Sequence, residues 1–350
     1  MKPEDLIRPE IRALAAYHVA PSEGMVKLDA MENPYPLPPA MRRELAQVLA
    51  AAELHRYPDP SAPKLRELLK RKMGVPAGME VLLGNGSDDL IQVLALALAR
   101  PGAVMMYPAP TFVMYAMNAA FSGMRAVAVP LREDFSFDAD AFIERMKVEK
   151  PALVFLAYPN NPTGVLYEEK DIERVIRACP GLVVLDEAYH VFAGRTFMSR
   201  LAEFSNLLVL RTVSKLGLAG IRLGYLAGPP AWIGELDKVR QVYNVNVLTQ
   251  AAASFVLERL EVLEAQAAQI RKDREALKTE LEKLKGVTVF PSAANFFLVR
   301  VADAPATFEA LRRQGVLVRN LHPGVKDCLR VTVGTPDENR ILLTALREAL

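Results

Sequence analysis

The chain has 350 residues, of which 51% are hydrophobic and 24% are charged. A chain of this size and composition can bury a sizeable core, and we expect one large domain and one smaller domain. Its 43 basic and 41 acidic residues form no dense block of either sign, which excludes the charge footprint of a nucleic-acid or membrane-surface protein.

The cysteines and histidines give no sign of a metal site. Cys179 and Cys328 are far apart in the sequence and match no paired ligand spacing, so we expect two reduced thiols. The four histidines are scattered and lack the close pairs that bind zinc. No segment approaches the roughly 20 apolar residues of a membrane span. These observations predict a cytoplasmic protein without a bound metal.

Helical patterns alternate with short apolar runs from about Pro38 to Val239. Helices are predicted at 40–51, 64–73, 88–99, 139–147 and 168–177. Strands are predicted at 81–83, 103–106, 126–129, 153–157, 182–185, 207–210 and 223–227. The apolar runs lack polar alternation, which is typical of strands buried on both faces of a parallel sheet. We therefore predict an α/β fold with a mostly parallel sheet flanked by helices, in a large domain over 38–246.

The character of the sequence changes after Asn246. A stretch rich in Ala, Glu, Leu, Lys and Arg, 249–284, predicts one long helix or two in series that bridge two domains. Beyond it, strands are predicted at 287–290, 296–299, 316–318 and 329–333, and helices at 306–313 and 337–350. We expect a small α+β domain formed by 247–350 and joined by an N-terminal arm, 1–37.

Four segments place polar residues directly after predicted strands, where ligands bind in open α/β sheets. In the first, residues 84–88, the chain turns through Gly84 and Gly86 into a helix. Such a turn can present backbone N–H groups and the Ser87 hydroxyl to an anion. The alternative is an ordinary strand–helix turn in which Ser87 or Asp88 caps the helix.

The other three segments contribute an amide, a carboxylate and an amine. Asn161 lies in a loop stiffened by proline and glycine, Asp186 closes a buried strand, and Lys215 follows another. A buried aspartate is costly unless a cation pairs with it, and a neighbouring arginine is the alternative partner. Lys215 could equally be a solvated surface lysine. Together, a phosphate cradle, an amide, a carboxylate, a tyrosine and an amine are what a pyridoxal phosphate site needs.

The order of these motifs resembles the fold-type I pyridoxal-phosphate-dependent aminotransferases over nearly the whole chain. The motifs are Asn-Gly-Ser-Asp at 85–88, Asn-Pro-Thr-Gly at 161–164, Asp-Glu-Ala-Tyr at 186–189, Ser-Lys at 214–215, and Arg222. Segments 28–34, 56–59, 219–225 and 329–335 look like those of histidinol-phosphate aminotransferases. The resemblance implies a fold-type I enzyme that moves an amino group between L-histidinol phosphate and 2-oxoglutarate in histidine biosynthesis, by a ping-pong reaction.

The resemblance also implies roles for the catalytic and cofactor-binding residues. Lys215 would form the Schiff base with pyridoxal 5'-phosphate and shuttle the proton. Asp186 would pair with the pyridinium nitrogen, and Asn161 and Tyr189 would donate to the phenolic oxygen. The phosphate would be held by the backbone around Gly86 and Ser87 together with Thr212, Ser214 and Arg222, and Asp88 is a further cofactor-binding position. Phe112 would stack on the cofactor ring, with simple core packing as its alternative.

Further matching positions concern the partner subunit and the substrate. Tyr57 matches a tyrosine that reaches the cofactor phosphate of the neighbouring subunit, which implies a homodimer with shared sites; an exposed tyrosine is the alternative. The matching substrate-binding residues are Tyr17, Asn33, Asn161, Arg319 and Arg330. Two guanidinium groups suit an anion that is a phosphate in one half-reaction and a carboxylate in the other. Asn295, like Asn33, matches a position near this pocket, and either could equally be a turn or strand-edge residue.

Two departures from the family pattern stand out. The stretch from Lys215 to Arg222 is one residue shorter than usual, and Met31 occupies a position where asparagine is common.

Three other functions fit the same residues. An aromatic-amino-acid transaminase and a threonine-phosphate decarboxylase share the cofactor, and a cofactor-free binding protein could use the scaffold. Against the last, a buried unpaired Lys215 and Asp186 would be expensive without the pyridinium.

Overall fold

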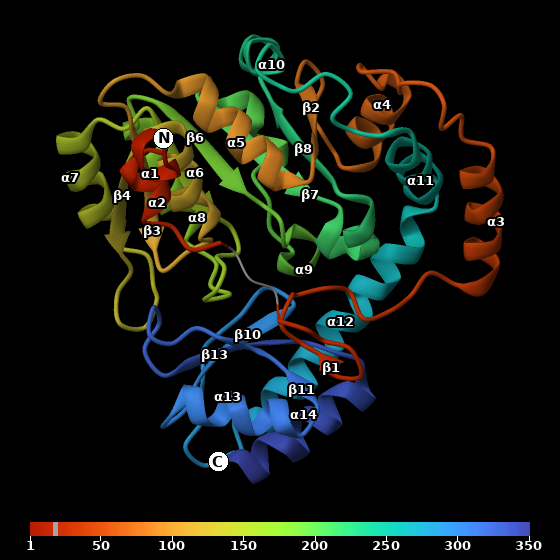
Figure 1. The fold of residues 1–350 in the computed structure, drawn as a ribbon, viewed down its shortest axis with the longest axis vertical. Coiled ribbons are helices and arrows are strands. Elements are labelled where there is room, and N and C mark those ends of the chain that lie inside the picture. Colours follow the sequence, from red (N-terminus) through yellow and green to blue (C-terminus); the bar gives the residue numbers. More distant parts are fainter. Residues whose placement is uncertain (17–19) are drawn as a thin grey trace.

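The computed structural model describes residues 1–16 and 20–350 and consists of a larger and a smaller unit (Figure 1). The larger unit is built around a central sheet with helices on both faces. The smaller unit is formed mainly by residues 282–350, at the C-terminal end of the chain. The helix α12 (Leu260–Leu281) runs from the larger unit into the smaller one.

A seven-stranded sheet organises the larger unit, in the order β2-β8-β7-β6-β5-β3-β4. Its strands are β2 (Glu80–Asn85), β3 (Val104–Ala109), β4 (Arg125–Pro130), β5 (Leu153–Ala157), β6 (Leu182–Asp186), β7 (Leu207–Thr212) and β8 (Leu223–Gly228). Neighbouring strands are parallel except at β8, which is antiparallel to β2 and β7. The mostly parallel sheet is therefore confirmed, with each strand close to its predicted position.

The antiparallel strand follows from a short connection. Residues 213–222 join β7 to β8. A parallel crossover needs a dozen or more residues, usually with a helix, so this segment can only turn the chain back alongside β7. The same segment contains Lys215, which is thereby kept at the carboxyl end of β7.

Both faces of the sheet are covered by helices and separate cores form on each. The helices of this unit are α3 (Pro39–Ala50), α4 (Pro63–Lys72), α5 (Ser87–Leu98), α6 (Met114–Ser122), α7 (Ala139–Glu149), α8 (Glu169–Ala178), α9 (His190–Ala193), α10 (Pro230–Asp237) and α11 (Val247–Glu258). All five side chains of β5 are buried, as expected for a strand covered on both sides. The sequence did not predict α6, because its residues are apolar almost all round and lack the polar face of an amphipathic helix.

The smaller unit combines an antiparallel sheet with two helices. The sheet has the order β12-β13-β10-β9, formed by β9 (Thr288–Val289), β10 (Phe296–Arg300), β12 (Arg319–Asn320) and β13 (Cys328–Thr332). Its helices are α13 (Ala304–Arg313) and α14 (Pro336–Ala349). The predicted bridging stretch is two helices, because α11 and α12 are separated at Arg259, whose backbone leaves the helical conformation.

The N-terminal segment contacts both units. Strand β1 (Val26–Lys27) pairs in parallel with β11 (Val316–Leu317) of the smaller unit. The short helices α1 (Pro3–Leu6) and α2 (Pro9–Arg12) lie beside α6, where Arg8 Nη2 donates to the carbonyl oxygen of Phe121 at 2.6 Å. The division of the chain at residues 38 and 247 stays a prediction. Across the described residues, no helix is long and apolar enough to cross a membrane.

Candidate active site

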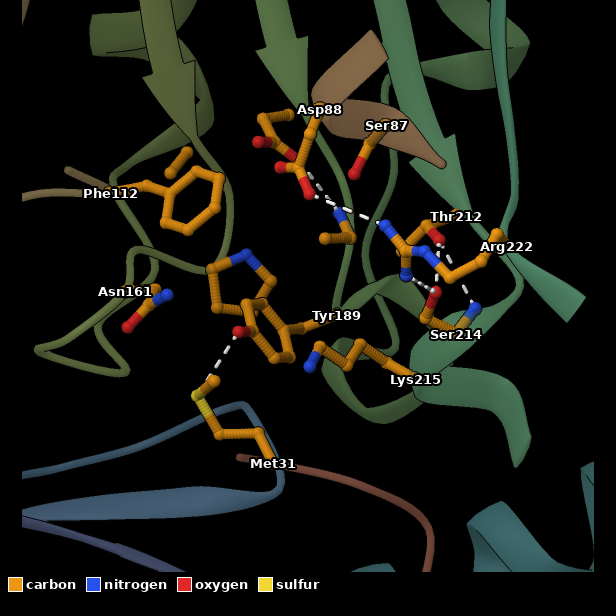
Figure 2. Close-up of a pocket in the computed structure, with 14 residues that line it drawn as sticks. Met31, Ser87, Asp88, Phe112, Asn161, Tyr189, Thr212, Ser214, Lys215 and Arg222 are labelled. Carbon is orange, nitrogen blue, oxygen red and sulfur yellow. Dashed lines mark hydrogen bonds and ion pairs between the residues drawn. The ribbon is translucent and has the colours of Figure 1, made fainter. Parts of the chain in front are cut away.

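A cavity of about 580 Å³ lies at the carboxyl ends of the central strands (Figure 2). It brings together ten residues that the sequence placed in the site: Ser87, Asp88, Phe112, Asn161, Asp186, Tyr189, Thr212, Ser214, Lys215 and Arg222. Four further residues line it, namely Met31, Ala157, Pro159 and Ala188. Parallel strands that end at one edge of a sheet explain why residues so far apart in sequence converge here.

Lys215 projects into the cavity from a π-helical turn, Ser214–Leu218, that follows β7. Its Nζ donates to the carbonyl oxygen of Ala30 at 2.8 Å. Burial lowers the pKa of Lys215 to about 8, with the positive charge of Arg330 acting in the same direction. The unprotonated form is therefore far more accessible near neutral pH than in an exposed lysine, and in that form the amine can act as a nucleophile or a base.

The turn that carries Lys215 depends on a glycine and an amide. Gly217 has a φ of 132°, and an added Cβ would come within 2.9 Å of Asn33 Nδ2. That Nδ2 donates to the carbonyl oxygen of Leu216 at 3.0 Å and to Gln266 Oε1 at 2.9 Å. Asn33, predicted to bind substrate, therefore contacts the turn behind Lys215 and is absent from the cavity lining.

Asp186 is only 5% exposed at the end of β6. Its Oδ2 accepts from the Tyr115 hydroxyl at 2.7 Å, and its Oδ1 accepts from the Ala188 N–H at 3.1 Å. Burial raises the pKa of Asp186 to about 6, although these two hydrogen bonds oppose the rise. A cationic partner inside the cavity would therefore stabilise the ionised carboxylate.

Arg211, the arginine that could have paired with Asp186, instead pairs with Glu187, the next residue in the sequence. Arg211 Nη2 donates to Glu187 Oε2 at 2.8 Å, and both side chains are buried. Successive residues of a strand point to opposite faces, so Glu187 faces the core while Asp186 faces the cavity. Within residues 1–16 and 20–350, no ion pair involves Asp186. The alternative of an arginine partner for Asp186 is thus not found.

Close-packed glycines shape a pocket for an anion at the start of α5. Gly86, with a φ of 84°, precedes the helix, and a Cβ there would lie 2.4 Å from Arg222 Nη2. A Cβ on Gly224 would lie 2.4 Å from the Ser87 backbone nitrogen. Only glycine permits these approaches, and they bring a guanidinium group to a helix N-terminus, where backbone N–H groups favour negative charge.

Arg222 reaches this pocket despite the shortened connection from Lys215. Its Nη1 lies 3.4 Å from Ser214 Oγ, and its Nη2 lies 3.4 Å from Asp88 Oδ2. Thr212 Oγ1 donates to Ser214 Oγ at 2.9 Å. The backbone of Arg222 adopts a φ of 51°, in the left-handed region, and this conformation ends the turn early enough for the side chain to enter the site.

Aromatic and amide side chains complete the walls. The Tyr189 hydroxyl donates to Met31 Sδ at 3.2 Å. Phe112 lines the cavity and meets Tyr115 edge to face, with ring centroids 5.8 Å apart. Asn161 Oδ1 accepts from Arg330 Nη1 at 2.7 Å, so the predicted substrate-binding arginine is linked to the cavity wall. The position of Phe112 is compatible with stacking on a flat ring.

Two other predicted site residues, Arg319 and Tyr57, are absent from the cavity lining. Arg319 on β12 is paired across the sheet with Arg330 on β13. Tyr57 is 81% exposed and stacks on Tyr243, with ring centroids 4.4 Å apart. Tyr17 lies outside the described residues. Asn295, also noted in the sequence, donates to the carbonyl oxygen of Met31 at 3.1 Å and supports the wall from behind.

Sequence reasoning missed Tyr115, the hydroxyl donor to Asp186. It lies on α6, the helix that the sequence did not predict, and it is fully buried. One signal was available: a tyrosine within an apolar run needs a partner for its hydroxyl once it is buried. The identity of that partner follows only from the packing of α6 against the sheet.

Residues 23–346 match the family model described as aminotransferase class I and II. The chain belongs to the class I and II aminotransferases. Among curated members, histidinol-phosphate aminotransferase 2 of Cupriavidus pinatubonensis is 58% identical, over 99% of this chain and 97% of its own length. Histidinol-phosphate aminotransferase 1 of Burkholderia lata is 54% identical, over 99% of both chains.

A solved aminotransferase structure has the same fold. Histidinol-phosphate aminotransferase from Sinorhizobium meliloti, in complex with pyridoxal-5'-phosphate, gives a TM-score of 0.87 at 26% identity. The alignment covers 98% of this chain and 97% of that one. The family and the fold type predicted from the motifs are both confirmed.

Replacing the buried amine of this aminotransferase should stabilise the cofactor-free protein. We expect Lys215→Met to raise the free energy of unfolding at pH 7 by up to about 3 kcal/mol, because protonating Lys215 in the folded state is costly. Below the folded-state pKa of about 8, Lys215→Met should show its full increase in the free energy of unfolding over the wild type. As the pH rises toward the ordinary value of 10.5, the unfolded state holds more protons than the folded state, so the wild type gains stability and the difference fades.

Urea unfolding of both proteins across this pH range measures the effect. Lys285→Met, at an exposed position beyond α12, is the matched control and should change stability by no more than about 0.5 kcal/mol. A Lys215→Met protein that is less stable than the wild type at pH 7 would contradict the burial of a destabilised amine.

Proposed function

We propose that the chain is a pyridoxal-phosphate-dependent histidinol-phosphate aminotransferase. It would move the amino group between L-histidinol phosphate and 2-oxoglutarate, by a ping-pong reaction in histidine biosynthesis. The observation that carries the proposal is one cavity that contains two buried ionisable groups: Lys215, whose pKa is lowered, and Asp186, which has no arginine partner among the described residues. The cofactor would supply an aldehyde for the amine and a cation for the carboxylate. The names of relatives that match over nearly the whole chain support the substrate.

The residues present fit the cofactor. A protonated ring nitrogen would supply the cation that the buried carboxylate of Asp186 lacks. A phosphate would bind beside the N-terminus of α5, where the Arg222 guanidinium lies against Gly86 and adds positive charge to that of the helix end. Phe112 lines the wall against which the flat ring would stack.

The chain's own groups would carry the proton transfer. When bound, pyridoxal phosphate supplies an aldehyde for the substrate amine and a ring that withdraws electrons from the substrate carbon. Asp186 would hold a proton on the ring nitrogen through its carboxylate. The Nζ of Lys215, with its pKa near 8, would take the proton from the substrate Cα. Tyr189 and Asn161 would orient the ring through their polar atoms.

Arg330 is the best candidate for holding the acidic group of each substrate. It is buried on β13, and its Nη1 contacts Asn161 at the cavity wall. A guanidinium fork binds phosphate and carboxylate oxygens with the same geometry, which suits an enzyme whose two substrates carry different acids. Arg319, one strand away, would add positive charge behind it.

A homodimer with shared active sites forms part of the proposal. Tyr57 lies among exposed apolar side chains, which include Leu54, Val242 and Tyr243. Exposed apolar surface that gathers in this way is typical of an interface between subunits. Because Tyr57 is absent from the lining of its own cavity, its hydroxyl would serve the phosphate in the partner's cavity.

We also propose that the enzyme works in the cytoplasm. Cys179 and Cys328 are both buried free thiols. Burial raises the pKa of each, which makes both poor nucleophiles and is compatible with a reducing compartment.

Single half-reactions test the proposed substrate. The cofactor-loaded enzyme is mixed separately with histidinol phosphate, phenylalanine and threonine phosphate, without a 2-oxo acid, and the absorbance of the bound cofactor is followed. We expect histidinol phosphate to react fastest and to release no carbon dioxide. Lys215→Ala should slow this step by at least about a hundredfold, because the base is lost.

The other outcomes identify the alternatives. Faster reaction with phenylalanine would indicate an aromatic-amino-acid transaminase. Reaction with threonine phosphate alone, with release of carbon dioxide, would indicate the decarboxylase. A protein that never takes up pyridoxal phosphate would indicate a cofactor-free binding protein.

Tyr57→Phe tests the shared site. The variant keeps the aromatic stack on Tyr243 but removes the hydroxyl, so we expect the Kd for pyridoxal phosphate to rise about tenfold, the effect of one hydrogen bond to a charged group. Tyr243→Phe is the matched control and should leave that Kd unchanged. Light scattering should give the mass of a dimer for all three proteins. A monomer with wild-type cofactor affinity in Tyr57→Phe would refute the shared site.

A further inference from the structure

We propose that Met31 helps to determine which amino donors the enzyme accepts, because its thioether forms an apolar wall that favours donors with an aromatic ring. The inference rests on the proposed function, since it concerns the same cavity and reaction. Histidinol phosphate carries such a ring, imidazole, and aromatic amino acids carry others. Glutamate carries none.

Met31 stands beside both groups that would hold a donor. Arg330 Nη2 donates to the carbonyl oxygen of Asp29 at 2.7 Å, and Lys215 Nζ donates to the carbonyl oxygen of Ala30 at 2.8 Å. Met31 is the next residue, and its side chain lines the cavity (Figure 2). A donor with its acidic group at Arg330 and its amine at Lys215 spans this segment. The remaining side chain on the donor's Cα, which carries the ring in histidinol phosphate, would then lie near Met31.

The backbone of Met31 is fixed in a conformation that methionine rarely adopts. Its φ is 54°, in the left-handed region, where asparagine is far better tolerated than a long side chain. The Met31 N–H donates to Thr332 Oγ1 at 3.0 Å, and its carbonyl oxygen accepts from Asn295 Nδ2 at 3.1 Å. These contacts from the smaller unit keep the strained residue in place. They direct its side chain into the cavity.

The chemistry of the side chain suits a ring. The thioether is polarizable and makes favourable contacts with aromatic edges. Met31 is 8% exposed, and its Sδ is a weak acceptor of the hydrogen bond from the Tyr189 hydroxyl at 3.2 Å. An asparagine here would relieve the backbone but would present an amide that needs polar partners. The wall would then lose its preference for an aromatic ring.

Equilibrium binding of two unreactive carboxylates tests the inference. The cofactor-loaded enzyme is titrated with 3-phenylpropionate, which carries a ring, and with glutarate, which does not; the absorbance of the bound cofactor reports binding. We expect Met31→Asn to raise the Kd for 3-phenylpropionate about three- to tenfold. The Kd for glutarate should stay within about twofold.

Two control variants separate side-chain chemistry from backbone strain. Met31→Leu keeps an apolar wall of similar volume without the sulfur, so the Kd for 3-phenylpropionate should rise less than in Met31→Asn, and the Kd for glutarate should stay within about twofold of the wild type. Lys150→Asn, at the exposed left-handed residue that ends α7, relieves similar strain away from the cavity and should change neither Kd.

The outcomes distinguish this inference from the proposed function. Equal weakening of both probes by Met31→Asn, or no change in either, would overturn the role of Met31 as a selective wall. A wild-type enzyme that takes up the cofactor but binds neither carboxylate would instead contradict the proposed function.

Discussion

Two buried ionisable groups at the carboxyl end of the sheet, Asp186 and Lys215, constrain the rest of the site. Desolvation raises the pKa of the carboxyl group and lowers that of the amine, so burial disfavours the charged form of each. Their nearest partners are neutral: a tyrosine hydroxyl and a backbone N–H for Asp186, and a backbone carbonyl for Lys215. A ligand that brings a ring cation and an aldehyde provides what both groups lack.

The fold keeps these groups apart from the charges that would neutralise them. Asp186, the last residue of β6, faces the cavity, while Glu187, the residue after it, points to the core and takes Arg211 as its partner. The short return from β7 to β8 places Lys215 and Arg222 on one connection, so that the amine and the anion pocket are set by the same turn. The smaller unit contributes Arg330 from β13, and the arm contributes the carbonyls that hold Arg330 and Lys215. The cavity therefore depends on both units.

Much of this arrangement could be predicted from the sequence, because uninterrupted apolar runs mark buried parallel strands and the polar residues after them mark the ligand edge. Asp186 and Lys215 were found in this way. Tyr115 was missed because α6 lacks a polar face, so the pattern did not separate it from its surroundings. The partner of Asp186 could not be chosen from the sequence either. Whether Arg211 meets Asp186 or Glu187 depends on the direction in which each side chain points at the end of β6, and this follows from strand register.

Some residues have contacts or proposed roles that no local sequence pattern predicts, because they depend on a second chain or on residues distant in the sequence. Tyr57 is exposed in the single chain, and its proposed role requires a partner subunit. Asn33 supports the turn that carries Lys215, a contact between residues 183 positions apart that no local pattern predicts. The left-handed backbone of Met31 is likewise imposed by Thr332 and Asn295, both distant in sequence.

The most direct test of the account is to find which amine carries the cofactor. The enzyme is loaded with pyridoxal phosphate, reduced with borohydride, digested and analysed by peptide mass spectrometry. The account predicts that the reduced cofactor is attached to the peptide containing Lys215, at close to one per chain, and that Lys215→Ala yields no specific attachment. Stoichiometric attachment to any other lysine of the wild-type protein would contradict it.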